Sequence, residues 1–216
     1  MKIIIIKFLI SYLLGSISGA MIMGKIKGMD IRKRGSGNAG GTNAFRIMGP
    51  LFALLVLSID ALKGWIAVNY IALLNISNAN SIQIINNESM QVICGICAVL
   101  GHVYPIFYQF KGGKGAGTMV GVLAALFPLG LFICFMFWLF SLFFSGYVGL
   151  STIIAGIIFP MVTSIFYHNG IYSSFGLFSC IIGIFIIFTH KENMKRMQRG
   201  EENKFKKIKI FSKNKN

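Results

Sequence analysis

A long uncharged stretch places the tightest limit on the fold of this chain. No Asp, Glu, Lys or Arg occurs from Ala116 to Phe166. A helix rises about 1.5 Å per residue and the hydrocarbon core of a bilayer is about 30 Å thick, so this stretch is far too long for one crossing. Breaks are expected at 128–130, which contains Pro and Gly, and at 145–146, which ends in Gly. The stretch therefore predicts three short transmembrane helices.

The composition places the rest of the chain in the membrane class as well. Hydrophobic residues make up 55% of the 216 residues and charged residues 12%, about half of the usual share of charge. Further apolar spans of bilayer length are expected at about 3–24, 51–75, 89–108 and 174–189. The sequence thus predicts an all-α polytopic membrane protein with about seven transmembrane helices, forming one integral membrane domain over 1–216. Five helices are the alternative, if part of the uncharged stretch is re-entrant or lies in the interface.

Basic residues alternate between loops and predict the orientation. The basic loops are 24–50 and 109–117, and the loops without Lys or Arg are 76–90 and 167–174. Loops rich in Lys and Arg stay on the cytoplasmic side. The N-terminus is therefore expected outside and the basic tail, 191–216, in the cytoplasm, where it lies on anionic headgroups or is solvated. Lys2 and Lys7 are on the wrong side in this arrangement.

The N-terminal apolar segment is interpreted as the first membrane helix. Small residues at Ser16, Ser18 and Ala20 would also suit a cleaved signal peptide. Cleavage would export the basic loop that follows, which the positive-inside rule opposes. The net charge of +15 arises from a shortage of acids, and the cations lie beside membrane spans, so no nucleic acid is expected as a partner.

No metal or cofactor is expected. Cys94 and Cys97 have the C-x-x-C spacing of redox and zinc motifs, but they lie in an apolar run without a second pair. We interpret them as packing residues one helical turn apart.

The first polar loop has the composition of an anion site. Small residues let backbone N–H groups approach a ligand, and hydroxyl and amide side chains add hydrogen bonds. An arginine three residues after a Thr-Asn pair can clamp an anion through two parallel hydrogen bonds. A plain linker is the alternative interpretation. The candidate residues here are Gly35, Ser36, Asn38, Thr42, Asn43 and Arg46.

The second polar loop has the composition of a phosphate cradle. Gly112, Gly113 and Gly115 surround Lys114, so backbone N–H groups and one point charge could converge on an oxyanion. It is not a Walker A motif, because a glycine rather than Ser or Thr follows the lysine. A flexible turn is the alternative. An apolar helix that opens at about residue 116 would point its positive dipole end at the loop, which favours the functional interpretation.

The third polar segment follows the last apolar span. His190, Asn193 and Arg196 recur at one helical turn and so share one face, which resembles the wall of a site. Snorkelling interfacial residues are the alternative. In the motif His-x-x-x-x-Asp, which many acyltransferases use, the acid orients a histidine base. No Asp stands five positions after any His of this chain, so the motif is absent.

Charged and polar residues within spans need partners. Asp60 and Lys63 are three residues apart inside the second span, and ionised groups in hydrocarbon are costly unless paired. We expect a structural pair, although Lys63 could instead face an active cleft. His102, just before Pro105, is expected to be a packing donor.

Together the three polar segments resemble the bacterial acyl-phosphate:glycerol-3-phosphate acyltransferases, the PlsY family. Residues 35–46 match its Gly-Ser-Gly-Asn…Thr-Asn…Arg pattern, and residues 101–115 match its Gly-His…Pro…Phe…Gly-Gly-Lys-Gly pattern. The His…Asn…Arg…Gly-Glu segment is matched from His190 to Glu201, and the likeness extends over essentially the whole chain in order. Gly146 and Gly149 depart from the family, which often has Arg and Ser there, so that only Ser151 keeps a hydroxyl.

The resemblance implies that an acyl group moves from acyl phosphate to the 1-hydroxyl of glycerol 3-phosphate in a bacterial plasma membrane, with the site on the cytoplasmic side. Lysophosphatidic acid and phosphate are the products, and membrane lipids surround the protein. The implied catalytic residues are Ser36, Arg46, Lys114, His190 and Asn193. The implied substrate-binding residues are Gly35, Asn38, Thr42, Asn43, Gly112, Gly113, Gly115, Ser151 and Arg196, and the implied structural residues are Asp60, Lys63 and Glu201.

Two questions stay open at the level of sequence. The general base is either His190 or the phosphate of the acceptor. An anion transporter would also need cations at helix ends, but it predicts polar residues along several spans, and the stretch 116–166 has no charge. A small regulatory membrane subunit would explain none of the loop motifs.

Overall fold

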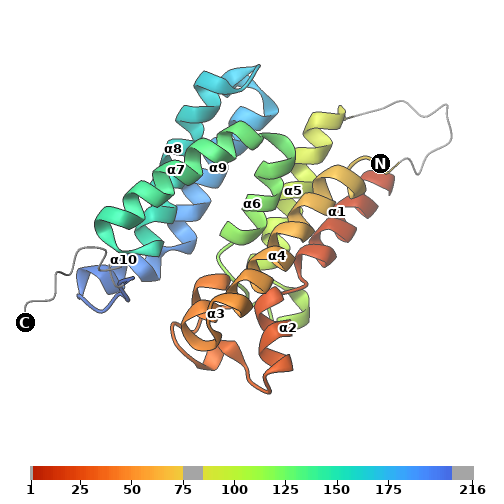
Figure 1. Ribbon diagram of the computed structural model, residues 1–216. Coiled ribbons are helices and arrows are strands. Elements are labelled where there is room, and N and C mark those ends of the chain that lie inside the picture. Colours follow the sequence, from red (N-terminus) through yellow and green to blue (C-terminus); the bar gives the residue numbers. More distant parts are fainter. Residues whose placement is uncertain (1, 75–84, 206–216) are drawn as a thin grey trace, which may run out of the picture.

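The computed structural model describes residues 2–74 and 85–205, and these residues form helices and connecting turns. Figure 1 shows their arrangement. The ten α-helices of these ranges are α1 (Lys2–Gly15), α2 (Gly19–Ile26), α3 (Gly41–Met48), α4 (Pro50–Ile66), α5 (Asn87–Val103), α6 (Ala116–Leu126), α7 (Pro128–Ser145), α8 (Val148–Phe166), α9 (Ser174–Thr189) and α10 (Lys191–Gln198). Four shorter helical turns are η1 (Ile31–Lys33), the π-helix η2 (Ala67–Ile71), η3 (Ile106–Tyr108) and η4 (Gly170–Tyr172). The predicted all-α membrane fold is confirmed.

Five segments are long and apolar enough to cross a membrane. They are Lys2–Ile26, Pro50–Ile71, Asn87–Tyr108, Pro128–Ser145 and Val148–Phe166. Helices α9 and α10 make a sixth if the two, which meet at a bend of 47°, count as one span. Helix α6 is apolar but has 11 residues, or about 16 Å of helix, which is short of a full crossing. The total of seven and the orientation of the termini stay predictions.

The uncharged stretch breaks where its sequence requires. Pro128 begins α7, where its missing N–H costs no hydrogen bond, and Gly146 ends α7 with a φ of 73°. Three helices therefore fill this stretch and break at the expected positions, and their number of membrane crossings stays a prediction. The predicted first span is itself interrupted, since α1 ends at Gly15 and the side chain of Ser18 caps the N-terminus of α2.

The helices form two groups (Figure 1). Helices α1, α4, α5 and α6 lie together, with α1 packed along α5 and α4 along α6. Helices α7, α8 and α9 form the other group, and contacts of α6 with α7 and of α5 with α9 join the two. Helices α2, α3 and α10 lie at one shared end of the molecule. This arrangement brings all three polar segments to that end, where they line one cavity.

Lys7 and the first part of the basic tail are both packed against the helices. Lys7, which the predicted orientation places outside, has a buried ammonium that donates to the carbonyl of Ala72 at 2.7 Å, just after η2. The expected basic tail is packed structure as far as Phe205, whose N–H donates to Gly146 O at 2.8 Å and whose ring stacks on Phe45. The rest of the tail, 206–216, and most of the uncharged loop, 75–84, lie outside the described residues.

Candidate active site

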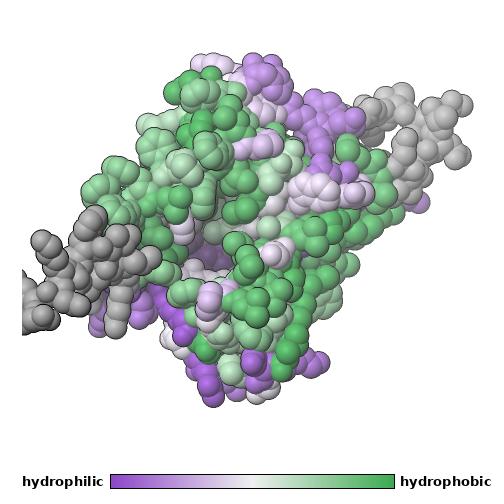
Figure 2. Space-filling view, in the orientation of Figure 1, coloured by the Kyte–Doolittle hydropathy of each residue, from purple (hydrophilic) through white to green (hydrophobic). Residues whose placement is uncertain are grey.

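A cavity of about 530 Å³ lies between the two helix groups and reaches all three polar segments. Figure 2 shows a hollow in the molecule with hydrophilic atoms in its depth and hydrophobic atoms around it. Its apolar wall comes from α4, α6, α7, α8 and α9. That wall includes Leu54, Leu57, Val120, Leu123, Leu131, Phe135, Trp138, Phe159, Ile182 and Ile186. Its polar wall includes Ser36, Asn38, Thr42, Asn43, Arg46, Asp60, His102, Lys114, Thr152, His190 and Asn193.

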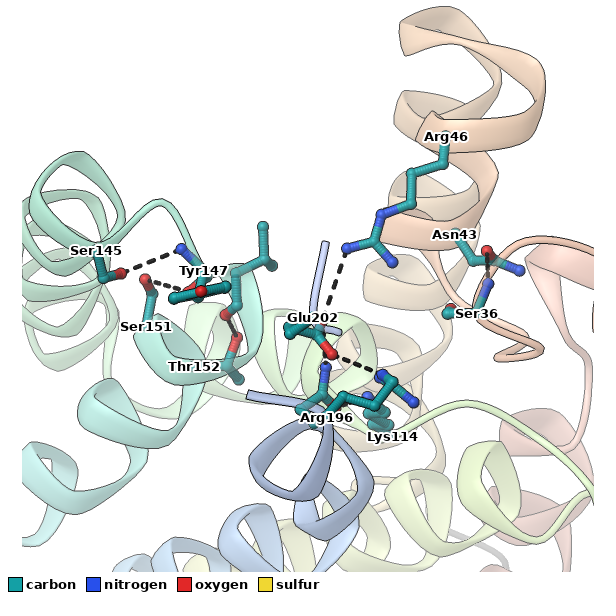
Figure 3. Close-up of polar contacts among 12 residues, drawn as sticks. Ser36, Asn43, Arg46, Lys114, Ser145, Tyr147, Ser151, Thr152, Arg196 and Glu202 are labelled. Carbon is teal, nitrogen blue, oxygen red and sulfur yellow. Dashed lines mark hydrogen bonds and ion pairs between the residues drawn. The ribbon is translucent and has the colours of Figure 1, made fainter. Parts of the chain in front are cut away.

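A buried carboxylate, Glu202, gathers the polar groups of the third segment (Figure 3). Its Oε2 accepts from Arg196 Nε at 2.7 Å, and its Oε1 accepts from Asn193 Nδ2 at 3.0 Å. Arg46, from α3, lies 3.8 Å from the same Oε1. The amide oxygen of Asn193 accepts a hydrogen bond from Lys114. Glu202 therefore contacts two cations, and Asn193 links it to a third, Lys114. One buried acid thus stands among three cations, and this end of the cavity carries surplus positive charge.

Burial and the surplus positive charge both lower the proton affinity of Lys114. Burial is the main cause, and the neighbouring cations Arg196 and Arg46 add to it, so that the pKa of Lys114 falls to about 8. The ammonium is still protonated below that pH. A bound anion would restore the missing negative charge and stabilise the ammonium, which suits a site for phosphate.

His190 is held as a neutral ring with one free nitrogen. It follows the last residue of α9, and its Nδ1 lies 2.9 Å from Ile186 O, a contact in which the ring must donate. Burial and the charge of Lys114 lower the pKa of His190 to about 4. The ring is therefore neutral near pH 7 and Nε2 carries a lone pair. It can accept a hydrogen bond or a proton from a ligand in the cavity.

The first polar loop is shaped by one of its own residues. The Oδ1 atom of Asn43 accepts from Ser36 N at 2.9 Å, and its Nδ2 donates to the carbonyls of Ile31 and Arg34. The amide of Asn43 is thus used within the loop, although the residue also lines the cavity. Ser36 lines the cavity too, and its hydroxyl makes no hydrogen bond to any other residue in the described ranges. Gly35 has a φ of 60° and stays off the wall.

The second polar loop differs from the predicted phosphate cradle. The N–H groups of Gly112 and Gly113 donate to Val103 O and His102 O, both at 3.1 Å, and so cap the end of α5. They have no free donor to offer a phosphate. Gly115, with a φ of 91°, is the N-cap of α6, and the first residues of that helix line the cavity. The expected helix start is confirmed, and the positive end of its dipole faces the cavity.

Two expected site residues are replaced by their neighbours. The buried hydroxyl of Ser151 donates to Tyr147 O at 2.9 Å within α8 and does not reach the cavity. Thr152 lines the cavity instead, and its Oγ1 accepts from Trp138 Nε1 at 3.2 Å. Glu201 has an exposed side chain, and the acid that organises the site is Glu202. The spacing of a sequence pattern cannot tell which of the two adjacent acids after the turn at Gly200 points into the site.

The expected pair in α4 is present and has a third member. Lys63 Nζ lies 3.0 Å from Asp60 Oδ1, and His102 of α5 contacts both. His102 is therefore more than a packing donor.

Two further residues of the resembled pattern have defined places. Position 149 departs from that pattern, and packing explains its glycine, because a Cβ there would lie 2.7 Å from Asn193 Nδ2. Arg196 stands behind the wall, bound to Glu202 rather than lining the cavity.

The comparisons with known proteins agree with this geometry. Residues 5–200 match the model of the family described as glycerol-3-phosphate acyltransferase. A glycerol-3-phosphate acyltransferase of Chlorobium phaeobacteroides is 35% identical over 91% of this chain and 94% of its own. Glycerol-3-phosphate acyltransferase 2 of Bacillus anthracis is 39% identical over 93% of this chain and 98% of its own.

Two solved structures share the fold. Both are of PlsY, an integral membrane glycerol 3-phosphate acyltransferase. Its glycerol 3-phosphate form has a TM-score of 0.80 and 32% identity, over 97% of this chain and 99% of that one. Its lysophosphatidic acid form has a TM-score of 0.79 and 31% identity, over 95% and 96%. This chain therefore belongs to the glycerol-3-phosphate acyltransferase family of integral membrane proteins that includes PlsY.

Proposed function

We propose that this protein transfers a fatty acyl group from acyl phosphate to the sn-1 hydroxyl of glycerol 3-phosphate. The observation that carries the proposal is one cavity that joins a cationic cluster to a long apolar wall. Both substrates carry a phosphate and one carries a lipid tail. The phosphates would neutralise the surplus charge of Arg46 and Lys114, and the tail would lie against the side chains of α6 to α9.

The reaction needs positioning more than acid catalysis. The 1-hydroxyl oxygen attacks the acyl carbon and forms the ester bond, the bond from that carbon to the phosphate oxygen breaks, and inorganic phosphate leaves with the electron pair. Acyl phosphate is a mixed anhydride, so the leaving group is good without protonation. Fixed cations that meet the developing charge on the phosphate would supply much of the rate.

The hydroxyl proton goes to a base, for which two groups qualify. His190 Nε2 has a free lone pair, and the phosphate of glycerol 3-phosphate can accept the proton itself. The Nδ1 atom of His190 donates to the carbonyl of Ile186, so no carboxylate hydrogen-bonded there stabilises a protonated ring. We therefore favour the acceptor phosphate as the base and His190 as a group that orients the hydroxyl.

The donor is tested by assay of the purified protein with labelled glycerol 3-phosphate. With acyl phosphate we expect lysophosphatidic acid and an equal amount of inorganic phosphate, and with acyl-CoA no product above background. Lys114→Ala serves as the inactive control. Efficient transfer from acyl-CoA, without release of phosphate, would refute the proposed donor while leaving the acceptor in place.

The site is proposed to face the cytoplasm of a bacterial plasma membrane. The basic loops 24–50 and 109–117 and helix α10 support this, because positively charged segments are retained inside. Single cysteines in a background without native thiols test it. Positions 33 and 111 should react only with reagent added from inside. Position 80, which lies outside the described residues, should react from outside, and opposite accessibility at 33 and 111 would separate the loops and break the shared site.

A further inference from the structure

Asp60, Lys63 and His102 form a buried cluster. Every hydrogen of the Lys63 ammonium at its centre has an acceptor. Their side chains are 2–3% exposed. Lys63 Nζ lies 2.6 Å from Ile17 O, 2.9 Å from His102 Nδ1 and 3.0 Å from Asp60 Oδ1. An ammonium has three hydrogens and here meets three acceptors. Lys63 therefore has no donor left for a ligand, and its charge is matched by one carboxylate.

Asp60 keeps one free oxygen. Its Oδ1 accepts from the ammonium of Lys63 and from the N–H of Gly19 at 3.2 Å, and His102 Nδ1 lies 3.4 Å from the same oxygen. Its Oδ2 makes no hydrogen bond to any residue of the ranges 2–74 and 85–205. Buried carboxylate oxygens normally have partners, and Asp60 lines the cavity. An acceptor without a partner is thus held at the cavity wall.

His102, whose Nδ1 lies 3.4 Å from Asp60 Oδ1, offers a free donor at the cavity wall. An ammonium can only donate, so the contact with Lys63 Nζ makes Nδ1 an acceptor and assigns a ring proton to Nε2. Within the described part of the chain Nε2 has no hydrogen-bond partner, and His102 also lines the cavity. A Cβ on Gly113 would lie 2.1 Å from Nε2 and would cover it. The missing side chain at 113 therefore leaves this donor open.

The two residues that carry these free atoms pack against the glycines on either side of Lys114 in the chain. Gly117, in the first turn of α6, faces Asp60, since a Cβ there would be 3.2 Å from Asp60 Cβ and 3.8 Å from Oδ2. Gly113 lies against His102 and directly precedes Lys114. A small ligand with its phosphate on Lys114 would have its carbon chain beside one acceptor and one donor. A hydroxyl group both donates and accepts, so it matches the pair.

We propose that Asp60 Oδ2 and His102 Nε2 form a subsite for the 2-hydroxyl of glycerol 3-phosphate. The inference rests on the proposed function and names how the acceptor is recognised. The cluster suits binding rather than proton removal, because the charge of Asp60 is already balanced by Lys63 at 3.0 Å. The two residues are thus binding groups that discriminate a glycerol from a simple alcohol phosphate.

The test compares glycerol 3-phosphate with 3-hydroxypropyl phosphate, which lacks only the 2-hydroxyl. With the wild-type protein and acyl phosphate, kcat/KM should favour glycerol 3-phosphate by about 10- to 100-fold, the usual effect of a hydrogen bond to a charged group. The loss should appear mainly in KM. Equal kcat/KM for the two acceptors in the wild type would overturn the proposal without any variant.

Variants then assign the preference to the cluster. Asp60→Asn should reduce the preference to about threefold or less, because kcat/KM falls more for glycerol 3-phosphate than for 3-hydroxypropyl phosphate. Thr152→Val, which removes a different cavity hydroxyl on α8, should keep the wild-type preference. The ratio is measured on one sample and does not depend on how much protein is folded. A cluster with only a structural role would lower both rates equally and leave the ratio unchanged, which would contradict the proposal.

Failure of this inference can be told from failure of the proposed function. If neither acceptor is acylated by acyl phosphate, the proposed reaction is wrong. If both are acylated and the ratio in Asp60→Asn equals that of the wild type, the reaction stands and the subsite is wrong. If Asp60→Asn cannot be purified, the wild-type comparison still decides whether the 2-hydroxyl is recognised.

Discussion

The Glu202 cluster and the Asp60 cluster border the same cavity but balance their charges differently. Glu202 is one carboxylate among Arg46, Arg196 and the nearby Lys114. The two arginine side chains are 22% and 27% exposed. Asp60 is one carboxylate paired with one ammonium, and both are almost wholly buried. The first cluster has unmet positive charge and the second has none.

The difference in net charge gives the two clusters different roles in the wall of the cavity. Unmet cations near solvent attract anions and gain stability when a phosphate arrives. A balanced buried pair contributes no net charge and is costly to open, so it is suited to fix helices and present neutral polar atoms. The comparison predicts that changes in the Asp60 cluster act first on stability, and changes in the Glu202 cluster act first on substrate binding and rate.

The largest effect is expected for Lys63→Met. It leaves the carboxylate of Asp60 buried without a counter-charge, which typically costs about 3–5 kcal/mol in the free energy of unfolding. The double variant Asp60→Leu with Lys63→Met should recover most of that loss. Thermal unfolding in detergent measures both. A single variant as stable as the wild type would break the comparison, because the pair would then not be a structural unit.

Lys114→Ala should abolish most activity and leave the fold intact. Loss of a fixed group that stabilises transition-state charge typically lowers the rate by about 10²–10³-fold. The midpoint of thermal unfolding should not fall, since the change removes one of three crowded cations. The measurement is kcat/KM with protein that elutes as the wild type does. Near-normal turnover would remove the second loop from the site.

The pH dependence of kcat/KM tests whether the charge of Lys114 is needed for activity. The pKa of Lys114 is lowered to about 8, so its charge is present below that pH and is lost as pH rises through it. For the wild type, kcat/KM for glycerol 3-phosphate should therefore fall above about pH 8, approaching tenfold per pH unit. Arg stays protonated, so Lys114→Arg should lose this fall wherever it keeps activity. An unchanged profile in that variant would assign the fall to another group.

Arg46→Lys should give a smaller loss, about tenfold, mainly as a raised KM. Arg46 lies 3.8 Å from Glu202, which leaves much of its fork free for a bidentate contact that a lysine cannot make. Ser36→Ala is the matched variant, because it removes a hydroxyl of the same loop that has no partner among residues 2–74 and 85–205. Full activity in both would show that the first loop is a linker.

The smallest effect on the pH profile is expected for His190→Gln. The pKa of His190 is lowered to about 4, so the ring stays neutral from about pH 5 upward and contributes no inflection near 6.5. A rise of activity near pH 6 should persist in the variant, because it reflects the second ionisation of the phosphate. The KM for glycerol 3-phosphate should increase. A large loss of kcat at unchanged KM would identify His190 as the base.

Several features of the molecule were determined by local sequence. Apolar runs predicted the helical membrane fold because a bilayer offers the backbone no other hydrogen-bond partner. Pro128 and Gly146 set the breaks of the uncharged stretch, since each restricts or frees φ at a single position. The pair of Asp60 with Lys63 follows from their spacing on one helix face. None of these depends on how distant segments meet.

The details of the site were decided only by tertiary contacts. The partner of Lys114 is Asn193, 79 residues away, and nothing in their separation marks them as neighbours. Gly112 and Gly113 have the composition of a phosphate loop, yet their donors are consumed by the carbonyl ends of α5 because the chain turns back there. Glu202 rather than Glu201 meets the arginines, since a turn fixes which of two adjacent acids points inward. Sequence restricts which groups are available, and the packing of distant helices decides which of their hydrogen bonds remain free for a substrate.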